Sequence, residues 1–245
     1  MNDHSHTQGQ VALITGANRG IGFETARELG ELGIRVILGS RDLAQGQKAA
    51  GLLVSRGFAA EAIKLDVTAP ADHQHALAWL SERYGKLDIL VNNAGILVRD
   101  STSIKASADL RQVFETNFFG TVELTQALLP LIRKSPAGRI VNVSSIVGSL
   151  TLHSDPQSRI YDSKIFSYDA SKTALNAFTV HLAYDLRDTA IKVNSADPGW
   201  VKTEMGGEHA LVELSEGGKT SARLATLPPD GPNGSYFRLD EVFPW

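Results

Sequence analysis

The chain has 245 residues, a formal net charge of -3 and no cysteine, and 42% of its residues are hydrophobic. This composition is ordinary for a water-soluble globular protein, and the lack of cysteine excludes disulfides, thiolate metal sites and cysteine nucleophiles. Lys and Arg form no run dense enough to bind nucleic acid or anionic membranes, and no apolar run approaches the ~20 residues of a membrane span. The polar start, MNDHSHTQGQ, lacks the apolar core of a signal peptide, so we expect a cytoplasmic protein.

Short β-branched apolar runs alternate with longer segments of helical periodicity along the chain. We expect strands at Val11–Thr15, Arg35–Leu38, Ala62–Leu65, Ile89–Val91, Arg139–Val143, Lys192–Ser195 and Ser235–Arg238. We expect helices near Ile21–Leu32, Leu43–Arg56, Ala71–Tyr84, Ala108–Lys134, Tyr168–Arg187 and Glu208–Ala225. This alternation is typical of a parallel sheet with helices on both faces, so we predict one α/β domain over residues 1–245, with 1–9 as a flexible arm.

Two segments break the alternation. Residues 149–167 are polar and contain Pro156, and the chain after Thr203 continues to the Pro- and Gly-rich LPPDGPNG. Long connections inside a compact α/β domain are often functional lids. We therefore expect 149–167 to be an insertion and 203–225 to be a substrate lid.

The first predicted strand runs into a glycine-rich turn, TGANRGIG, and then into a helix. Glycine permits a tight turn and close approach of the backbone to a pyrophosphate, while N–H groups at the helix N-terminus face the anion. Gly16, Gly20 and Gly22 therefore predict a phosphate-binding turn. The alternative is a tight connection that binds nothing, but the position after the first strand favours a dinucleotide.

The second predicted strand ends in Gly39-Ser40-Arg41, and the nearest acid, Asp42, comes one residue later. An acid at the strand end would bind the ribose hydroxyl of NADH, whereas guanidinium groups pair with a phosphate. Arg41, together with Arg19 in the glycine turn, therefore favours NADPH over NADH. The alternative is that both arginines are merely solvated.

Seven motifs occur in an order that resembles the short-chain dehydrogenase/reductase family. They are TGANRGIG (Thr15 to Gly22), Asp66-Val67, NNAG (Asn92 to Gly95), Asn117 in NFFG, Ser144-Ser145 in VNVSS, Tyr168 to Lys172 in YDASK, and Pro198 to Thr203 in PGWVKT. The resemblance runs from about Gln10 to the C-terminus. Three features are similar to the carbonyl-reductase branch of the family: the long segment before Tyr168, the stretch PGWVKTEMGG and the stretch GPNGSYF. It implies a doubly wound Rossmann fold with a seven-stranded parallel sheet.

The resemblance also implies a cofactor site. Its members are Gly16, Asn18, Arg19, Gly20, Ile21, Gly22, Arg41, Asp66, Val67, Asn93, Ala94, Gly95, Tyr168, Lys172, Pro198, Gly199, Val201 and Thr203. Asp66 is expected to accept a hydrogen bond from the adenine amino group. Val201 and Thr203 are expected to hold the nicotinamide carboxamide.

The catalytic residues implied by the resemblance are Asn117, Ser145, Tyr168 and Lys172. Hydride transfer to a carbonyl puts negative charge on its oxygen, so the site needs an acid and a fixed hydrogen-bond donor there. Tyr168 would give the proton and Ser145 the second hydrogen bond, while Lys172 would lower the pKa of Tyr168 from its usual ~10 and Asn117 would hold a water. Ser144 remains an alternative to Ser145, because successive strand residues point to opposite faces.

The stretch RIYDSKIFSYDASK holds two Tyr–Lys pairs at helical spacing, and spacing alone does not choose between them. Tyr168 and Lys172 open a long amphipathic pattern, whereas Tyr161 and Lys164 follow Pro156 in the extra segment. We therefore predict that Tyr168 is the acid and that Tyr161 covers the cleft.

The substrate residues are expected to be Ser145, His153, Tyr161, Trp200 and Met205, which together favour a carbonyl compound with a hydrophobic or aryl group. His153 is open to the alternative that it is simply solvated. In the carbonyl-reductase branch the extra segment can cover a dimer face, so a monomer or a homodimer is expected.

The prediction for function is an NADPH-dependent carbonyl reductase or alcohol dehydrogenase. An alternative from another class is a catalytically weak NADP-binding sensor or scaffold protein with the same fold. An acyl-carrier-linked substrate would require a basic docking patch, and none is clear in the sequence.

Overall fold

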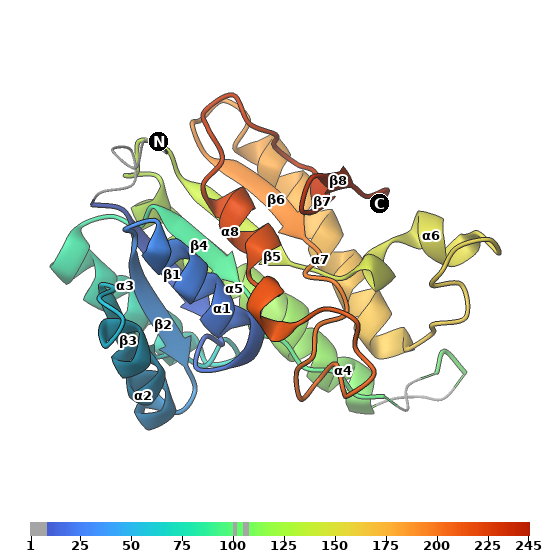
Figure 1. Ribbon diagram of the computed structural model, residues 1–245. Helices are drawn as coiled ribbons and strands as arrows, with labels where there is room; N and C mark the ends of the chain where they lie inside the picture. Colours follow the sequence, from blue (N-terminus) through green and yellow to red (C-terminus); the bar gives the residue numbers. More distant parts are fainter. Residues whose placement is uncertain (1–8, 100–101, 105–107) are drawn as a thin grey trace.

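An eight-stranded sheet in the order β3-β2-β1-β4-β5-β6-β7-β8 forms the centre of the structure (Figure 1). The computed structural model describes residues 9–99, 102–104 and 108–245, so the first eight residues of the expected N-terminal arm lie outside the described part. The strands are β1 Val11–Thr15, β2 Arg35–Ser40, β3 Ala60–Lys64, β4 Ile89–Asn92, β5 Arg139–Val143, β6 Lys192–Ala196, β7 Tyr236–Arg238 and β8 Glu241–Val242.

The helices are α1 Gly20–Glu31, α2 Leu43–Val54, α3 Pro70–Tyr84, α4 Ala108–Phe114, α5 Gly120–Ile132, α6 Leu150–Ser154, α7 Phe166–Asp185 and α8 Lys219–Ala225. Three shorter turns are η2 Glu115–Phe119, η3 Ile146–Gly148 and η4 Leu214–Glu216. The alternation of strands and helices confirms the predicted α/β Rossmann fold.

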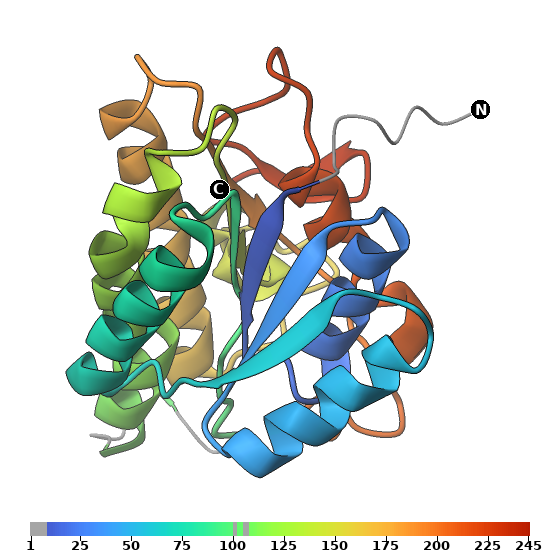
Figure 2. The same ribbon diagram turned by 90° about the vertical axis from the view of Figure 1, so that its left-hand side faces the viewer.

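Apolar residues on both sides of each central strand explain the three layers. In β1, Val11 and Leu13 pack with α3, α5 and α7, whereas Ala12 and Ile14 pack with α1, α2 and α8. Figure 2 shows these two helical layers on opposite sides of the twisted sheet. A strand buried on both faces reads as a continuous apolar run, and this is why β1 and β5 could be placed from the sequence.

The seven predicted parallel strands are confirmed, and the structure adds an eighth strand at one edge. All pairs from β3 to β7 are parallel, but β7 turns back at Leu239 and pairs with β8 in the antiparallel direction. The eighth strand has only two residues, Glu241 and Val242, and both are exposed. So short an exposed strand carries no hydrophobic periodicity that a sequence pattern could detect.

Two predicted helices also differ from the structure. The long helix expected at Ala108–Lys134 contains a π-helical turn, η2, between α4 and α5. Of the helix expected at Glu208–Ala225 only the short 3₁₀ turn η4 and α8 are helical, because Val212 pairs with Val201 in an isolated β-bridge. Helix α6, which lies in the predicted insertion and was not expected, is capped by Ser149, whose Oγ accepts a hydrogen bond from Leu152 N at 3.2 Å.

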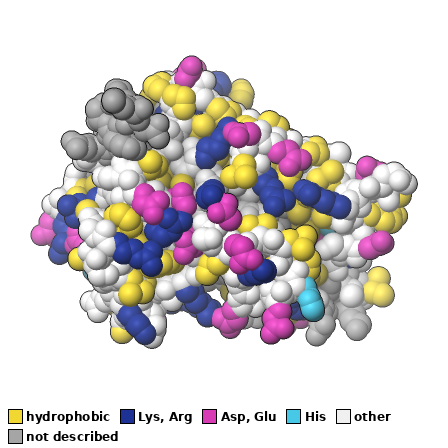
Figure 3. Space-filling model, viewed as in Figure 1, with side chains coloured by type: hydrophobic (Ala, Val, Ile, Leu, Met, Phe, Trp, Pro, Cys, Tyr) yellow, Lys and Arg dark blue, Asp and Glu magenta, His cyan; other side chains and the backbone are white. Residues whose placement is uncertain are grey.

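The strand order reverses between β1 and β4, which are parallel neighbours although far apart in sequence. In open α/β sheets, ligands bind outside the carboxyl ends of the strands at such a switch point. On the face shown in Figure 3, side chains of Lys and Arg are interspersed with those of Asp and Glu. Within the described residues, no helix is both long enough and apolar enough to cross a membrane.

Gly120 provides a test of the packing between α5 and the loop after β3. A Cβ on Gly120 would lie 2.2 Å from the carbonyl oxygen of Val67, which is backbone and cannot easily move. Gly120→Ala should therefore lower the free energy of unfolding by about 1–3 kcal/mol. Gly51→Ala in the exposed middle of α2, where the added Cβ meets nothing within 4 Å, should raise it by ~0.5–1 kcal/mol. Urea unfolding of both variants measures the difference, and equal midpoints would contradict the packing described.

Candidate active site

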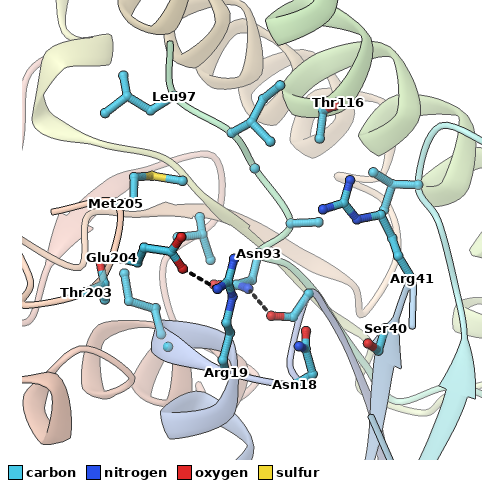
Figure 4. A pocket seen from close by; sticks show the side chains of 18 of the residues that line it. Asn18, Arg19, Ser40, Arg41, Asn93, Leu97, Thr116, Thr203, Glu204 and Met205 are labelled. Carbon is cyan, nitrogen blue, oxygen red and sulfur yellow. Dashed lines mark hydrogen bonds and ion pairs between the residues drawn. The ribbon is translucent and has the colours of Figure 1, made fainter. Parts of the chain in front are cut away.

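A cleft of about 1100 Å³ lies at the carboxyl ends of the strands, around the switch point between β1 and β4 (Figure 4). It is lined by these predicted cofactor residues: Gly16, Asn18, Arg19, Gly20, Ile21, Arg41, Asp66, Val67, Asn93, Ala94, Gly95, Tyr168, Lys172, Pro198 and Thr203. Gly22, Gly199 and Val201 belong to the same turns but do not line the cleft. The structure thus brings together residues from five separate sequence motifs.

The glycine turn has the backbone that the sequence pattern predicts. Gly16 and Gly20 adopt φ values of 63° and 61°, a region that favours glycine. A Cβ on Gly22 would lie 2.5 Å from Asn93 Nδ2, which donates a 2.8 Å hydrogen bond to Thr15 O. Asn93 therefore braces the turn from β4, and Gly22 serves that close packing instead of facing the cleft.

The N-terminus of α1 opens on the cleft beside this turn. Among the described residues, no side chain caps that helix end, and its first turn carries no acid. Uncapped N–H groups and the positive end of the helix dipole favour an anion there. The turn and α1 therefore fit the pyrophosphate of a dinucleotide.

The end of β2 lacks an acid that could bind a ribose hydroxyl. Asp42 caps α2 instead, because its Oδ1 accepts a hydrogen bond from Gln45 N at 3.2 Å. The exposed Arg41 lines the cleft beside it (Figure 4). Asp42 lines the cleft as well, but its carboxylate caps α2, whereas Arg41 presents a cation at this end of the cleft.

Arg19 has a partner that the sequence did not indicate. Its Nη1 forms an ion pair with Glu204 at the start of the predicted lid, across the cleft (Figure 4). Both side chains are more than two-thirds exposed, so the pair is screened by solvent and contributes little to stability. Arg19 is therefore shared between the lid and any phosphate in the cleft.

Asp66, the expected adenine ligand, lines the cleft and is also tied to its own loop. Its Oδ1 accepts hydrogen bonds from the backbone N and from Oγ1 of Thr68, at 2.9 and 2.8 Å. These bonds hold the carboxylate in one orientation at the end of β3.

Tyr168 and Lys172 lie one helical turn apart near the start of α7. Lys172 Nζ is 5.5 Å from the centre of the Tyr168 ring and donates a 2.7 Å hydrogen bond to Val143 O at the end of β5. Lys172 is only 4% exposed, and burial lowers its pKa to about 8. The pair therefore lies inside the cleft, fixed to the sheet through Lys172.

The two serines after β5 point in different directions. Ser145 forms a hydrogen bond with the Tyr168 hydroxyl, whereas the buried Ser144 faces the hydroxyl of Tyr236. The geometry therefore places Ser145, and not Ser144, next to the proposed acid.

Burial raises the pKa of Tyr168 well above its ordinary value, and the carboxylates of Asp197 and Asp169 raise it further. The hydrogen bond with Ser145 acts in the opposite direction. We expected Lys172 to lower this pKa, but in the described structure burial and the two carboxylates outweigh any such effect. A phenol that keeps its proton at neutral pH is in the form that a general acid needs.

Asn117 lies in the π-helical turn η2 and is 1% exposed. Its Oδ1 accepts a 2.8 Å hydrogen bond from Ile96 N, and its Nδ2 donates to Ile96 O and to Ser171 Oγ, both at 3.0 Å. Both polar atoms of the side-chain amide therefore form hydrogen bonds within the protein, and these bonds link the loop after β4 to α7. A water-holding role for Asn117 stays a prediction of the resemblance.

Of the four further substrate residues expected beside Ser145, only Met205 lines the cleft. His153 Nε2 donates to Val147 O at 2.8 Å, and its Nδ1 accepts from Lys164 Nζ at 2.9 Å, so both ring nitrogens have partners. Tyr161 and Trp200 are 39% and 52% exposed, away from the cleft lining. Lys164 holds His153 within the 149–167 segment, and Trp200 Nε1 donates a 2.8 Å hydrogen bond to Gly206 O, so these three residues do not line the cleft.

The sequence reasoning also missed several residues of the cleft, among them Arg99 and Thr116. Arg99 Nη2 donates a 2.5 Å hydrogen bond to Met205 O, 106 positions later in the chain. Thr116 precedes Asn117 and could have been found from that position, but no local pattern predicts the contact of Arg99.

Comparisons with known proteins agree with this geometry. The family described as short chain dehydrogenase matches residues 10–211. Mouse carbonyl reductase [NADPH] 1 is 34% identical, with 96% of this chain and 98% of that protein covered, and (+)-neomenthol dehydrogenase of Arabidopsis thaliana is 31% identical, with 95% and 97% covered.

A solved structure of NADPH-bound carbonyl reductase from chicken fatty liver superimposes with a TM-score of 0.82 at 31% identity, covering 97% of this chain and all of that one. The family match and the full-length relatives confirm the resemblance drawn from the seven motifs. The chain belongs to the short-chain dehydrogenase family of oxidoreductases.

Proposed function

We propose that this protein is an NADPH-dependent carbonyl reductase, and in reverse an alcohol dehydrogenase, for ketones or aldehydes that carry a hydrophobic or aryl group. The observation that carries the proposal is that Tyr168, which is hydrogen-bonded to Ser145, lines the same cleft as Lys172 and Arg41. Relatives along the full length include proteins named carbonyl reductase [NADPH], which supports the same activity.

The bound cofactor would supply a hydride to the carbonyl carbon of the substrate. Tyr168 donates its phenolic proton to the carbonyl oxygen, and Ser145 donates a second hydrogen bond that stabilises the charge developing there. Lys172, held by Val143 O, positions the ring from the next helical turn. In the reverse direction the Tyr168 phenolate accepts the proton of the alcohol.

The glycine turn and the N-terminus of α1 would hold the pyrophosphate, and Arg41 would hold the 2′-phosphate. Residues 198–203 would hold the nicotinamide carboxamide, as the resemblance implies. The residues therefore favour NADP(H), with the Arg41 cation at the ribose end and the neighbouring Asp42 engaged as the cap of α2.

The substrate side of the cleft carries apolar side chains: Ile96, Leu97, Met205 and Leu214. We infer that they receive the hydrophobic part of a small carbonyl substrate. Residues 203–225 are proposed as the lid and 149–167 as the insertion of a single domain. A cytoplasmic location and a monomeric or homodimeric state stay predictions.

Tyr168→Phe tests the acid. Loss of a general acid typically costs 10²–10⁴-fold, so NADPH oxidation with aryl ketones, diketones or aldehydes should fall by at least ~100-fold. Tyr161→Phe is the matched control, because Tyr161 is exposed outside the cleft and its loss should change turnover little. Comparable turnover in wild type and Tyr168→Phe would reject Tyr168 as the acid. Tight NADPH binding by wild type without turnover across the panel would instead favour the sensor or scaffold.

Arg41→Ala tests the choice of cofactor. Removal of a charge-assisted hydrogen bond to the 2′-phosphate should lower kcat/KM with NADPH by roughly 10- to 100-fold and leave kcat/KM with NADH nearly unchanged. The control is Arg56→Ala, an exposed arginine just beyond the C-terminal end of α2 and outside the cleft lining. Equal losses with both cofactors would show that Arg41 does not read the phosphate.

A further inference from the structure

Asp197 is a buried carboxylate that the proposed mechanism does not use. It lies between the end of β6 and Pro198, is 1% exposed, and its backbone N donates a 2.7 Å hydrogen bond to Phe237 O. A buried acid is expensive unless its charge is compensated, so its partners indicate what it does.

The carboxylate joins two turns that both border the proposed chemistry. Oδ1 accepts a 2.9 Å hydrogen bond from Ile146 N, the residue after Ser145, and Oδ2 accepts a 3.2 Å bond from Gly199 N. Two N–H donors suit an ionised carboxylate, since a protonated one would need an acceptor for its own O–H. Asp197 thus spans the Ser145 turn and the turn assigned to nicotinamide.

Four ionisable groups face this carboxylate from the elements packed around it. Arg238 Nε of β7 lies 4.0 Å from Oδ2, and Arg159 of the 149–167 segment is a second cation nearby. The phenols of Tyr168 in α7 and Tyr236 in β7 both lie within its electrostatic influence. Burial raises the pKa of Asp197, whereas the Ile146 and Gly199 N–H groups and the two arginines act in the opposite direction and favour its ionised form. The carboxylate in turn disfavours ionisation of the two phenols.

We propose that Asp197 is a positioning residue of the active site, which holds the Ser145 turn against the Pro198–Gly199 turn and presents a negative charge to the Tyr168 phenol. This inference rests on the proposed function, because that function assigns the proton transfer to Tyr168. Asp197 acts through Ser145 and Tyr168 and touches neither substrate nor cofactor.

The sign of the electrostatic effect follows from the charge. A carboxylate near a phenol disfavours the phenolate, so Asp197 contributes to the raised pKa of Tyr168, after burial itself. A neutral residue at position 197 removes that contribution and lets Tyr168 lose its proton at lower pH. For alcohol oxidation, which needs the phenolate, the rate should then rise at lower pH than in wild type.

Asp197→Asn is the direct test, and its first readout is independent of activity. The chain has five tyrosines, so the signal of Tyr168 must be separated from the other four. Phenolate absorbance is titrated against pH in two pairs of cofactor-free proteins: wild type and Tyr168→Phe, and Asp197→Asn and the double variant Asp197→Asn/Tyr168→Phe. The difference within each pair isolates Tyr168, and its midpoint should be lower in the Asp197→Asn background. An unchanged midpoint would overturn the electrostatic half of the proposal.

The second readout is kinetic. The amide of Asn accepts at one atom only, so one of the two turns loses its anchor, and kcat for carbonyl reduction should fall by roughly 10- to 100-fold. NADPH affinity, which depends mainly on the other end of the cleft, should change less than about threefold. The control is Asp188→Asn, whose side chain is 88% exposed, and it should change neither value. Wild-type kcat in Asp197→Asn would overturn the positioning role.

Arg238→Gln tests the effect of the Asp197 charge by removing its neighbouring cation. This variant keeps the proposal testable if Asp197→Asn does not fold. Arg238 is 31% exposed, and its removal leaves the Asp197 charge less compensated, so alcohol oxidation should require higher pH than in wild type. No shift, or a shift to lower pH, contradicts the proposal. If the wild-type protein turns over no carbonyl or alcohol, the proposed function fails. If the wild type is active and the variants have the same kcat and the same pH dependence, only the role of Asp197 fails.

Discussion

A buried hydrogen bond, from Lys172 Nζ to Val143 O at 2.7 Å, joins the helix that carries the proposed acid to the last residue of β5, two positions before the proposed serine. Without it, a buried carbonyl would be left unsatisfied, at a cost of about 1–3 kcal/mol, and α7 could shift along β5. Because Tyr168 lies one turn before Lys172 and Ser145 two residues after Val143, this bond sets the distance between the two hydroxyls. Lys172 therefore positions Tyr168 even where burial, and not its charge, dominates the pKa of the phenol.

A chain of buried polar side chains reinforces the same joint deeper in the molecule. Asn92 Nδ2 donates to Asn142 Oδ1 at 2.8 Å, and Asn142 Nδ2 donates to Thr179 Oγ1 at 2.8 Å. Thr179 shares a 2.9 Å hydrogen bond with Ser195. These contacts tie β4, β5 and β6 to the middle of α7 with directional bonds, which apolar packing alone does not provide.

Much of the fold and part of the site could be predicted from local signals. Val11–Thr15 and Arg139–Val143 are buried on both faces, so their apolar runs identify them as central strands. The glycine turn was predicted correctly because its left-handed φ values favour glycine. The two-residue strand β8 and the segment around Val212 carried no such signal, since β8 has only two residues, both exposed, and Val212 forms only an isolated β-bridge with Val201.

The sequence by itself determined the α/β layering and the glycine turn, and it favoured Tyr168 over Tyr161 as the proposed acid, because periodicity and backbone geometry are local properties. Only the tertiary structure decided which serine meets Tyr168, that His153 is bound by Lys164 and Val147, and that Arg19 pairs with Glu204. It also decided the electrostatic surroundings of Tyr168. Asp197 and Tyr168 are separated by most of α7 and all of β6, and the carboxylate raises the pKa of the phenol only because folding buries both where water no longer screens the charge.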